Sequence, residues 1–196
     1  VWAEIVDKVM PALLAANTNG AALRAWTPAC STGEEAYSLA IAFHETVERL
    51  KPAGVFSLQI FATDLDSDAI DIARNGQYPA NISADVSEAR LQRYFVQDNG
   101  GYRVCKDIRD MVIFAPQNIV MDPPFTKLDL LTCRNLLIYL EADLQKKLLP
   151  LFHYSLKPGG FLVLGSAETA GVASEMFTPL PGKTRIYQRR EMALRA

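Results

Sequence analysis

The sequence predicts an α/β fold built on a mostly parallel sheet, with a small insertion in its middle. Short apolar runs that indicate buried strands alternate with segments whose apolar residues recur at helical spacing. Residues 78–110 interrupt this alternation with weaker periodicity and more charge. Because strands that alternate with helices form parallel sheets, ligands are expected at the carboxyl ends of the strands.

The first half of the chain has the pattern helix, strand, helix, strand, helix. Apolar spacing predicts a first helix that has no capping residue and that Pro11 must kink or divide. The second strand leads through Asp64 to a short helix that Asn75-Gly76 stops. The predicted elements are a helix over 1–14, a strand over 22–29, a helix over 36–50, a strand over 58–63 and a helix over 69–73.

The second half begins with the stretch 78–110, which we interpret as an inserted subdomain. Its turn signal, Asn99-Gly100-Gly101, predicts a small hairpin around Tyr102-Arg103-Val104. Pro150 argues for a bend in the following helix, and Lys157-Pro158-Gly159-Gly160 predicts a turn. The remaining predicted elements are strands over 111–114, 128–132, 161–164 and 185–188 and a helix over 141–156.

The composition is that of one globular domain. It argues against nucleic-acid-binding, disulfide-linked, metal-binding and membrane-spanning proteins. The chain has 196 residues, of which 49% are hydrophobic and 21% charged, and its net charge of -2 predicts no nucleic-acid partner. Cys30, Cys105 and Cys133 form no Cys-x-x-Cys pair, so we expect neither disulfides nor a metal site. Since the sequence has no membrane-length apolar run and no signal peptide, we predict a cytoplasmic protein without membrane insertion.

The loop from Ala29 to Gly33 is the first candidate binding element. It joins a strand to a helix, where free backbone N–H groups and the helix dipole favour a carboxylate or a phosphate. The loop matches neither the phosphate-binding motif G-x-x-x-x-G-K-[ST] nor the dinucleotide motif G-x-G-x-x-G. A single glycine is a weak signal, and the alternative is that Gly33 only permits a turn.

Asp64 is the second candidate, because it ends the next strand along the chain. In dinucleotide-binding folds an acidic side chain at this place accepts hydrogen bonds from ribose hydroxyls. The alternative is helix capping, since Asp66, Ser67 and Asp68 also gather at a helix start. We assign Asp66 and Ser67 to the cap and Asp64 to a nucleoside-containing ligand.

Five segments of the chain form a set that is specific to one family. They are Ala29-Cys30-Ser31-Thr32-Gly33-Glu34-Glu35-Ala36-Tyr37-Ser38, Ala62-Thr63-Asp64-Leu65-Asp66, Gln117-Asn118-Ile119, Cys133-Arg134-Asn135-Leu136-Leu137-Ile138-Tyr139 and Leu156-Lys157-Pro158-Gly159-Gly160. Together they resemble the CheR-type chemotaxis receptor methyltransferases over essentially the whole chain. The resemblance implies a Rossmann-like methyltransferase sheet with helices on both faces and a small inserted β-subdomain, so that 1–196 is a catalytic domain with 78–110 inserted.

The resemblance implies a protein-glutamate O-methyltransferase that uses S-adenosyl-L-methionine (SAM) and releases S-adenosyl-L-homocysteine (SAH). Its substrates would be glutamate-bearing helices of chemoreceptors. In some members the β-subdomain also holds a receptor's C-terminal peptide by extending its sheet. Basic residues in or beside the insertion are candidates for receptor docking, or form a solvated charged face: Arg90, Arg93, Arg103, Lys106 and Arg109.

The resemblance also assigns site residues by matching position. Asn118 and Ile119 would lie by the adenine of the cofactor, and Arg134, Asn135 and Tyr139 would border the transferred methyl group as catalytic residues. Arg134 would hold the acceptor carboxylate with its planar fork of donors. The full cofactor-binding set is Ala29, Ser31, Thr32, Gly33, Glu35, Asp64, Asn118, Ile119, Cys133 and Arg134.

The chain departs from the family pattern at its start. Members carry an N-terminal helical domain and an Asn-x-Thr-x-Phe-Phe-Arg segment, and neither is found in 1–196. We therefore expect a domain of a longer protein. The stretch Asp122-Pro123-Pro124-Phe125 with Leu130-Leu131-Thr132-Cys133 resembles the methyltransferase part of multidomain signalling proteins.

Two alternatives to glutamate methylation stay open. The first is a catalytically weak SAM- or SAH-binding regulatory module, which would show the same cofactor residues. The second is a methyltransferase for a small molecule or nucleic acid, which is disfavoured because no Asn-Pro-Pro-aromatic motif follows the strand at 128–132. An ionised glutamate needs no general base, so the role we expect for His44 and His153 is structural.

Overall fold

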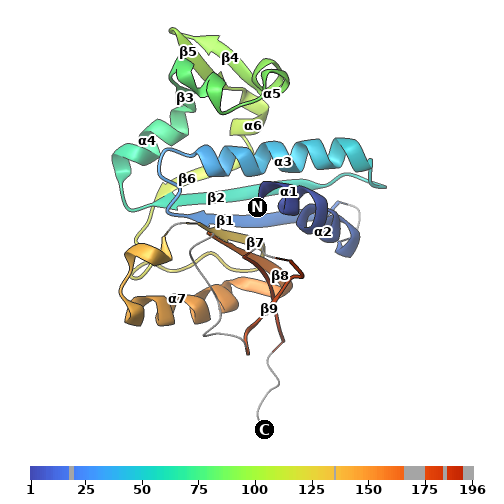
Figure 1. The fold of residues 1–196 in the computed structure, drawn as a ribbon, viewed down its shortest axis with the longest axis vertical. Coiled ribbons are helices and arrows are strands. Elements are labelled where there is room, and N and C mark those ends of the chain that lie inside the picture. Colours follow the sequence, from blue (N-terminus) through green and yellow to red (C-terminus); the bar gives the residue numbers. More distant parts are fainter. Residues whose placement is uncertain (18–19, 135, 166–174, 183–184, 192–196) are drawn as a thin grey trace.

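A seven-stranded sheet forms the centre of the molecule, as the computed structural model shows (Figure 1). The structure describes residues 1–17, 20–134, 136–165, 175–182 and 185–191. In spatial order the strands are β6 (Val112–Pro116), β2 (Ser57–Asp64), β1 (Ala22–Pro28), β7 (Leu128–Cys133), β8 (Leu156–Leu164), β10 (Ile186–Arg189) and β9 (Phe177–Pro179). The first five are parallel and β10 is antiparallel to β8, which confirms the predicted mostly parallel α/β sheet.

Alternation along the strands supplies two hydrophobic faces. Leu23 and Ala25 of β1 point into one core cluster, whereas Trp26 belongs to the other. The first face is covered by α1 (Trp2–Glu4), η1 (Ile5–Val9), α2 (Met10–Ala16), α3 (Glu34–Leu50) and α4 (Ser67–Asn75), and the second by α7 (Ala142–Ser155). Figure 1 shows α3 and α7 on opposite sides of the sheet, so helices cover both faces.

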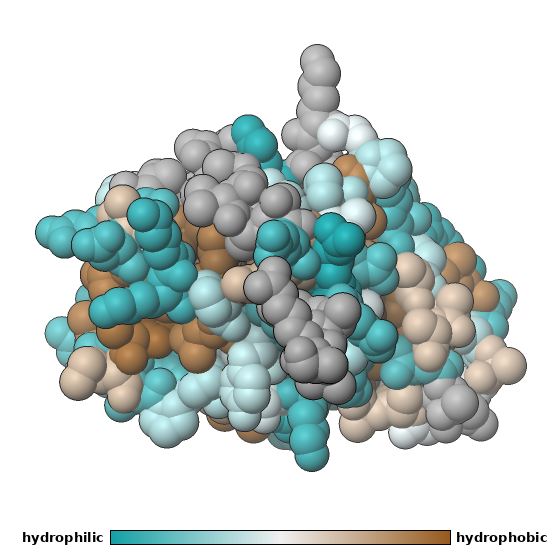
Figure 2. Space-filling model, turned by 90° about the horizontal axis from the view of Figure 1, so that it is seen from below, coloured by the Kyte–Doolittle hydropathy of each residue, from teal (hydrophilic) through white to brown (hydrophobic). Residues whose placement is uncertain are grey.

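Helix α7 is amphipathic, as the spacing of its apolar residues predicts. Leu148, Leu149 and Phe152 are buried against the sheet. The outward residues include Lys146 and Lys147, and Figure 2, drawn from this side, shows hydrophilic side chains over much of the face. No helix in the described part of the chain is long and apolar enough to cross a membrane.

The N-terminal helix changes its type just before Pro11, as expected of a proline there, but the helical backbone continues through it. Helical backbone runs from Trp2 to Ala16, and the wider π-helical turn of η1 lies just before Pro11, which stands in the first turn of α2. Proline has no N–H to donate and its ring crowds the preceding turn, so a local change of helix type accommodates it. The helix thereby keeps Ile5, Val9 and Leu13 in the core.

Residues 77–109 form a second unit beside α3 that contains its own sheet. Three strands, β3 (Gln77–Tyr78), β5 (Gly101–Val104) and β4 (Phe95–Asp98), lie in that order with antiparallel pairing. The hairpin predicted around Tyr102 is confirmed, and it turns at Asn99 and Gly100, both of which have positive φ. The unit also holds η2 (Ala80–Ala84), α5 (Glu88–Tyr94) and α6 (Lys106–Arg109).

The prediction of a strand over 161–164 was too short. Strand β8 starts at Leu156, and the predicted turn at 157–160 lies within it as a bulge. Leu156 pairs with Leu128 and Phe161 pairs with Leu130. Between these two pairs β8 therefore has more residues than β7, which is a β-bulge. Strand β9 was not predicted, because three residues carry too little periodicity.

Candidate active site

The loop between β1 and α3 has an unusual backbone. Ala29, Ser31 and Gly33 have φ values of 54°, 50° and 93°, a region that costs residues with a Cβ about 1–2 kcal/mol. Cys30 N–H donates to the Thr63 carbonyl of β2 at 2.9 Å, and Gly33 N–H donates to the Cys30 carbonyl at 3.0 Å. Strained backbone that its surroundings hold in place is typical of binding sites.

Helix α3 starts at this loop without a side-chain cap. Its N-cap is Gly33, which has no side chain and makes no side-chain cap hydrogen bond. Thr32, the neighbour that has a hydroxyl, donates to the Glu34 carboxylate at 2.5 Å instead. The backbone N–H groups at this amino end are therefore placed to meet an anionic group of a ligand.

Asp64 and Asp66 make different contacts, and those of Asp66 confirm the predicted helix cap. The Asp66 carboxylate caps α4 by accepting from Asp68 N–H at 3.0 Å and from Ala69 N–H at 3.3 Å. The Asp64 carboxylate accepts from Ser31 N–H at 2.8 Å and from Asp66 N–H at 2.9 Å, so it ties β2 to the loop after β1. A carboxylate has about four acceptor sites, which leaves capacity for ligand hydroxyls.

The Cys30 thiol lies within this loop but is not a nucleophile. Burial, followed by the charge of Asp64, raises its pKa to about 12. The thiol is therefore protonated at neutral pH, which removes covalent catalysis through it. Among the residues that the structure describes, no group of three His, Cys, Asp or Glu side chains is placed to hold a metal ion.

The segment after β6 is organised by Asn118. Its side-chain oxygen accepts from Val120 N–H at 3.0 Å and from Met121 N–H at 3.1 Å, while Asp122 accepts from Asn118 N–H at 2.8 Å. Ile119 packs against the second core cluster. The arrangement leaves Val120 and Met121 exposed, which the sequence reasoning did not single out.

Cys133 is the last residue of β7, and Arg134 follows it. The Cys133 side chain is fully buried in the second core cluster, so only its backbone can face a ligand at the sheet edge. The Arg134 guanidinium lies over the Trp2 ring, 5.7 Å from its centroid. Tyr139 is 79% exposed, and Asn135 lies outside the described residues.

Two buried polar atoms at this edge have no hydrogen-bond partner within the part of the chain that the structure describes. They are Oε1 of Gln117, after β6, and Nε of Arg134, after β7. Buried polar atoms in folded proteins are almost always paired, so unpaired ones need an explanation. Their place at the carboxyl ends of parallel strands is the place where such folds bind ligands, and a polar ligand would satisfy them.

A hollow of about 480 Å³ opens beside α3, between the N-terminal helix and the second sheet. Its lining includes Trp2, Glu34, Ser38, Tyr78 and Arg90. Trp2 was not recognised from the sequence, because its contact with Arg134 joins residues far apart in the chain. The hollow therefore extends from Trp2 to residues of the inserted unit such as Tyr78 and Arg90.

Comparisons with known proteins identify the family of this chain. Residues 1–186 match the family model described as "CheR methyltransferase, SAM binding domain". Over 169 residues the chain is 40% identical to chemotaxis protein methyltransferase 1 of Pseudomonas aeruginosa, which covers 83% of this chain and 60% of that protein. The chemotaxis protein methyltransferase of Escherichia coli is 33% identical over 170 residues, covering 82% of this chain and 57% of that protein.

A longer relative is an uncharacterized 104.1 kDa protein of Rhodobacter capsulatus. It is 40% identical over 188 residues, which make up 95% of this chain and 19% of that protein. The chain thus spans only part of each of these relatives. The family model covers nearly the whole chain, and the chain therefore belongs to the CheR methyltransferases, of which it forms the SAM-binding domain.

Proposed function

We propose that this domain catalyses methylation of glutamate side chains in chemoreceptor proteins, as a SAM-dependent protein-glutamate O-methyltransferase. The observation that carries the proposal is Arg134, a half-buried arginine at the end of β7 whose Nε has no partner in the described structure. A planar guanidinium at the carboxyl ends of the parallel strands, where we place the cofactor, suits an acceptor that is a carboxylate. Family membership supplies the cofactor and the type of reaction.

The residues at the sheet edge fit SAM. We assign the carboxylate of its methionine part to the backbone at 29–33 and the amino end of α3, and its ribose to Asp64. Glu35, Asn118, Ile119, Cys133 and Arg134 complete the proposed set, with the adenine near Asn118 and Ile119. When bound, SAM supplies a methyl group on a positively charged sulfur.

The residues of the chain act by positioning the acceptor. A glutamate side chain has a reference pKa near 4.3, so it is already ionised at neutral pH and needs no general base. Both histidines are used elsewhere: His44 Nδ1 lies 3.1 Å from the Tyr94 hydroxyl, and His153 Nε2 lies 3.0 Å from the Arg190 carbonyl. Arg134 holds the carboxylate in line, Trp2 supports its guanidinium, and we place Asn135 and Tyr139 beside the methyl path.

The second sheet is the proposed place for a receptor's C-terminal peptide. Strand β4 forms an edge of that sheet and carries Val96, which is 60% exposed, so an extended peptide can add a strand there. The basic residues of the insertion support this docking less than the sequence suggested, because they have partners within the chain. Arg90 pairs with Glu45, Arg93 with Glu48, Lys106 with Asp110, Arg103 with the Asn75 carbonyl and Arg109 with the Val104 carbonyl.

The structure adds an argument against amino-methylating enzymes. The Phe125 ring stacks on Phe61 with centroids 4.4 Å apart and meets Trp26 edge-on at 5.6 Å. The Asp-Pro-Pro-Phe stretch thus has its aromatic residue packed against the second core cluster before β7, not displayed after a strand. The other alternative, a regulatory SAM-binding module without activity, is distinguished from the enzyme by the next experiment.

The direct test uses the full-length protein, methyl-labelled SAM and chemoreceptor helices that contain the acceptor glutamates. We expect label on the receptor that base treatment releases, because carboxyl methyl esters are base-labile. Receptor helices with glutamine at the acceptor positions are the control and should stay unlabelled. SAM binding without any transfer would overturn the proposed activity in favour of the regulatory module.

The two aspartates provide a matched prediction for the cofactor site. Asp64→Ala should weaken SAH binding about 10- to 100-fold, because charge-assisted hydrogen bonds contribute about 1.5–3 kcal/mol. Asp66→Ala should leave SAH affinity nearly unchanged and lower stability by about 1 kcal/mol, because it removes the α4 cap. Titration calorimetry and thermal unfolding measure the two effects, and equal losses of affinity would contradict the assignment of Asp64.

A further inference from the structure

The side chain of Tyr78 connects the inserted unit to the loop at 29–33. The Tyr78 hydroxyl, on β3, donates to the Thr32 carbonyl at 2.7 Å. Thr32 lies between Ser31 and Gly33, both of which have positive φ. Burial raises the pKa of the Tyr78 phenol well above its usual value, so the hydroxyl stays a donor.

A second tyrosine provides a natural comparison. The Tyr37 ring meets the Tyr78 ring edge-on, with centroids 6.3 Å apart, and both are buried. The Tyr37 hydroxyl also donates to a backbone carbonyl, but to that of Ala73 on α4, at 2.6 Å. Burial raises its pKa to about 12. The two phenols thus differ mainly in what they hold: Tyr78 holds the cofactor loop and Tyr37 holds a neighbouring helix.

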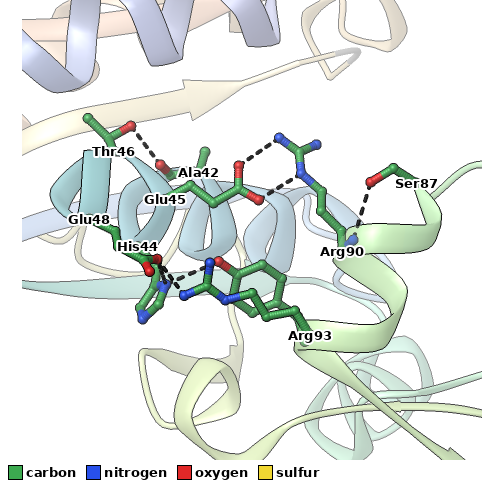
Figure 3. Close-up of polar contacts among 9 residues, drawn as sticks. Ala42, His44, Glu45, Thr46, Glu48, Ser87, Arg90 and Arg93 are labelled. Carbon is green, nitrogen blue, oxygen red and sulfur yellow. Dashed lines mark hydrogen bonds and ion pairs between the residues drawn. The ribbon is translucent and has the colours of Figure 1, made fainter. Parts of the chain in front are cut away.

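Ion pairs between α5 and α3 attach the inserted unit, which carries Tyr78, to the main sheet's helix layer. Figure 3 shows Arg90 of α5 reaching Glu45 of α3, while Arg93 and His44 meet at Glu48. Arg90 binds Glu45 through both Nε and Nη2, at 2.8 and 2.9 Å. Glu45 and Glu48 lie in the second half of α3, whereas Tyr78 meets Thr32 just before α3 begins. The unit is therefore attached to the catalytic core along the length of α3.

We infer that Tyr78 is a positioning residue of the SAM site, which the inserted unit contributes to the loop at 29–33. Its hydroxyl keeps the loop in the strained conformation before the ligand arrives. Without this bond the free loop relaxes, and binding must restore the conformation at a cost in affinity. The inference rests on the proposed location of SAM at this loop.

The test compares Tyr78→Phe with Tyr37→Phe in the full-length protein. Each variant loses one buried hydroxyl and keeps its ring, so similar losses of thermal stability are expected. We expect SAH affinity to fall about 5- to 10-fold in Tyr78→Phe, the range of one net hydrogen bond, and to stay within about twofold in Tyr37→Phe. Hydrogen exchange at the Ser31 and Gly33 amides of the free protein should accelerate in Tyr78→Phe alone.

The outcomes separate the inference from the site on which it rests. Equal changes of affinity in the two tyrosine variants would show a merely structural role and would overturn the inference. Wild-type affinity in Tyr78→Phe, alongside lost affinity in Asp64→Ala, would overturn it while the SAM site stands. Wild-type affinity in both Tyr78→Phe and Asp64→Ala would remove the SAM site and the inference together.

Discussion

Gly33→Ala is expected to destabilise the fold by about 2–5 kcal/mol. A Cβ at this position would lie 2.9 Å from the Ala73 Cβ and 3.1 Å from two ring atoms of Phe114. Overpacking of this kind costs about 1–3 kcal/mol, and the positive φ of 93° adds about 1–2 kcal/mol for a residue with a side chain. Ala73 on α4 and Phe114 on β6 are both buried, so neither side chain can turn out toward solvent. Urea unfolding measures the loss.

Gly100→Ala is the matched control for this prediction. Gly100 also has a positive φ, of 76°, but a Cβ there would meet nothing within 4 Å. The Gly100→Ala variant should therefore lose only the free energy that a positive φ costs a residue with a Cβ, about 1–2 kcal/mol. The difference between the two variants isolates the close approach of the loop to α4 and β6. If the two variants lost the same free energy of unfolding, the close approach would contribute nothing. Gly33 would then only permit a turn, which is the alternative that the sequence left open.

The elements at the site were predictable because their signals are local. The strand that ends before Cys30, the small residues of the turn and the apolar spacing of the next helix lie within one stretch of sequence. The same holds for β2, and for Asp66, whose cap involves residues two and three positions ahead. Sequence patterns within a few residues therefore predict the local secondary structure directly.

The parts that escaped prediction depend on contacts between distant residues. Trp2 meets Arg134, and Tyr78 meets Thr32, only after the sheet and the inserted unit have formed. The bulge in β8 is of the same kind, because its Gly-containing turn signal is genuine and only pairing with β7 makes it part of a strand. Sequence spacing carries no information about such pairs.

Arg134→Lys is expected to lower turnover by about 10- to 100-fold while the KM for SAM changes by less than about threefold. Lysine keeps the positive charge but loses the planar pair of donors, so it no longer fixes the acceptor carboxylate in line, and small misplacements cost about this much in rate. The half-buried position and the unpartnered Nε, within the described residues, make the side chain available for this contact. Steady-state kinetics on receptor helices with the full-length protein measure both constants.

Two controls separate this role from general effects of substitution. Arg49→Lys changes an exposed arginine on α3 that contacts Asp7 and the Val6 carbonyl, and it should leave turnover unchanged. The double variant His44→Gln and His153→Gln should also stay active, since neither ring faces the site. The pH profile should then lack a limb near 6.5 and should fall only toward about 4.3, where the acceptor glutamate protonates. A histidine-dependent limb, or full turnover in Arg134→Lys, would overturn the positioning mechanism and leave the fold and the cofactor unaffected.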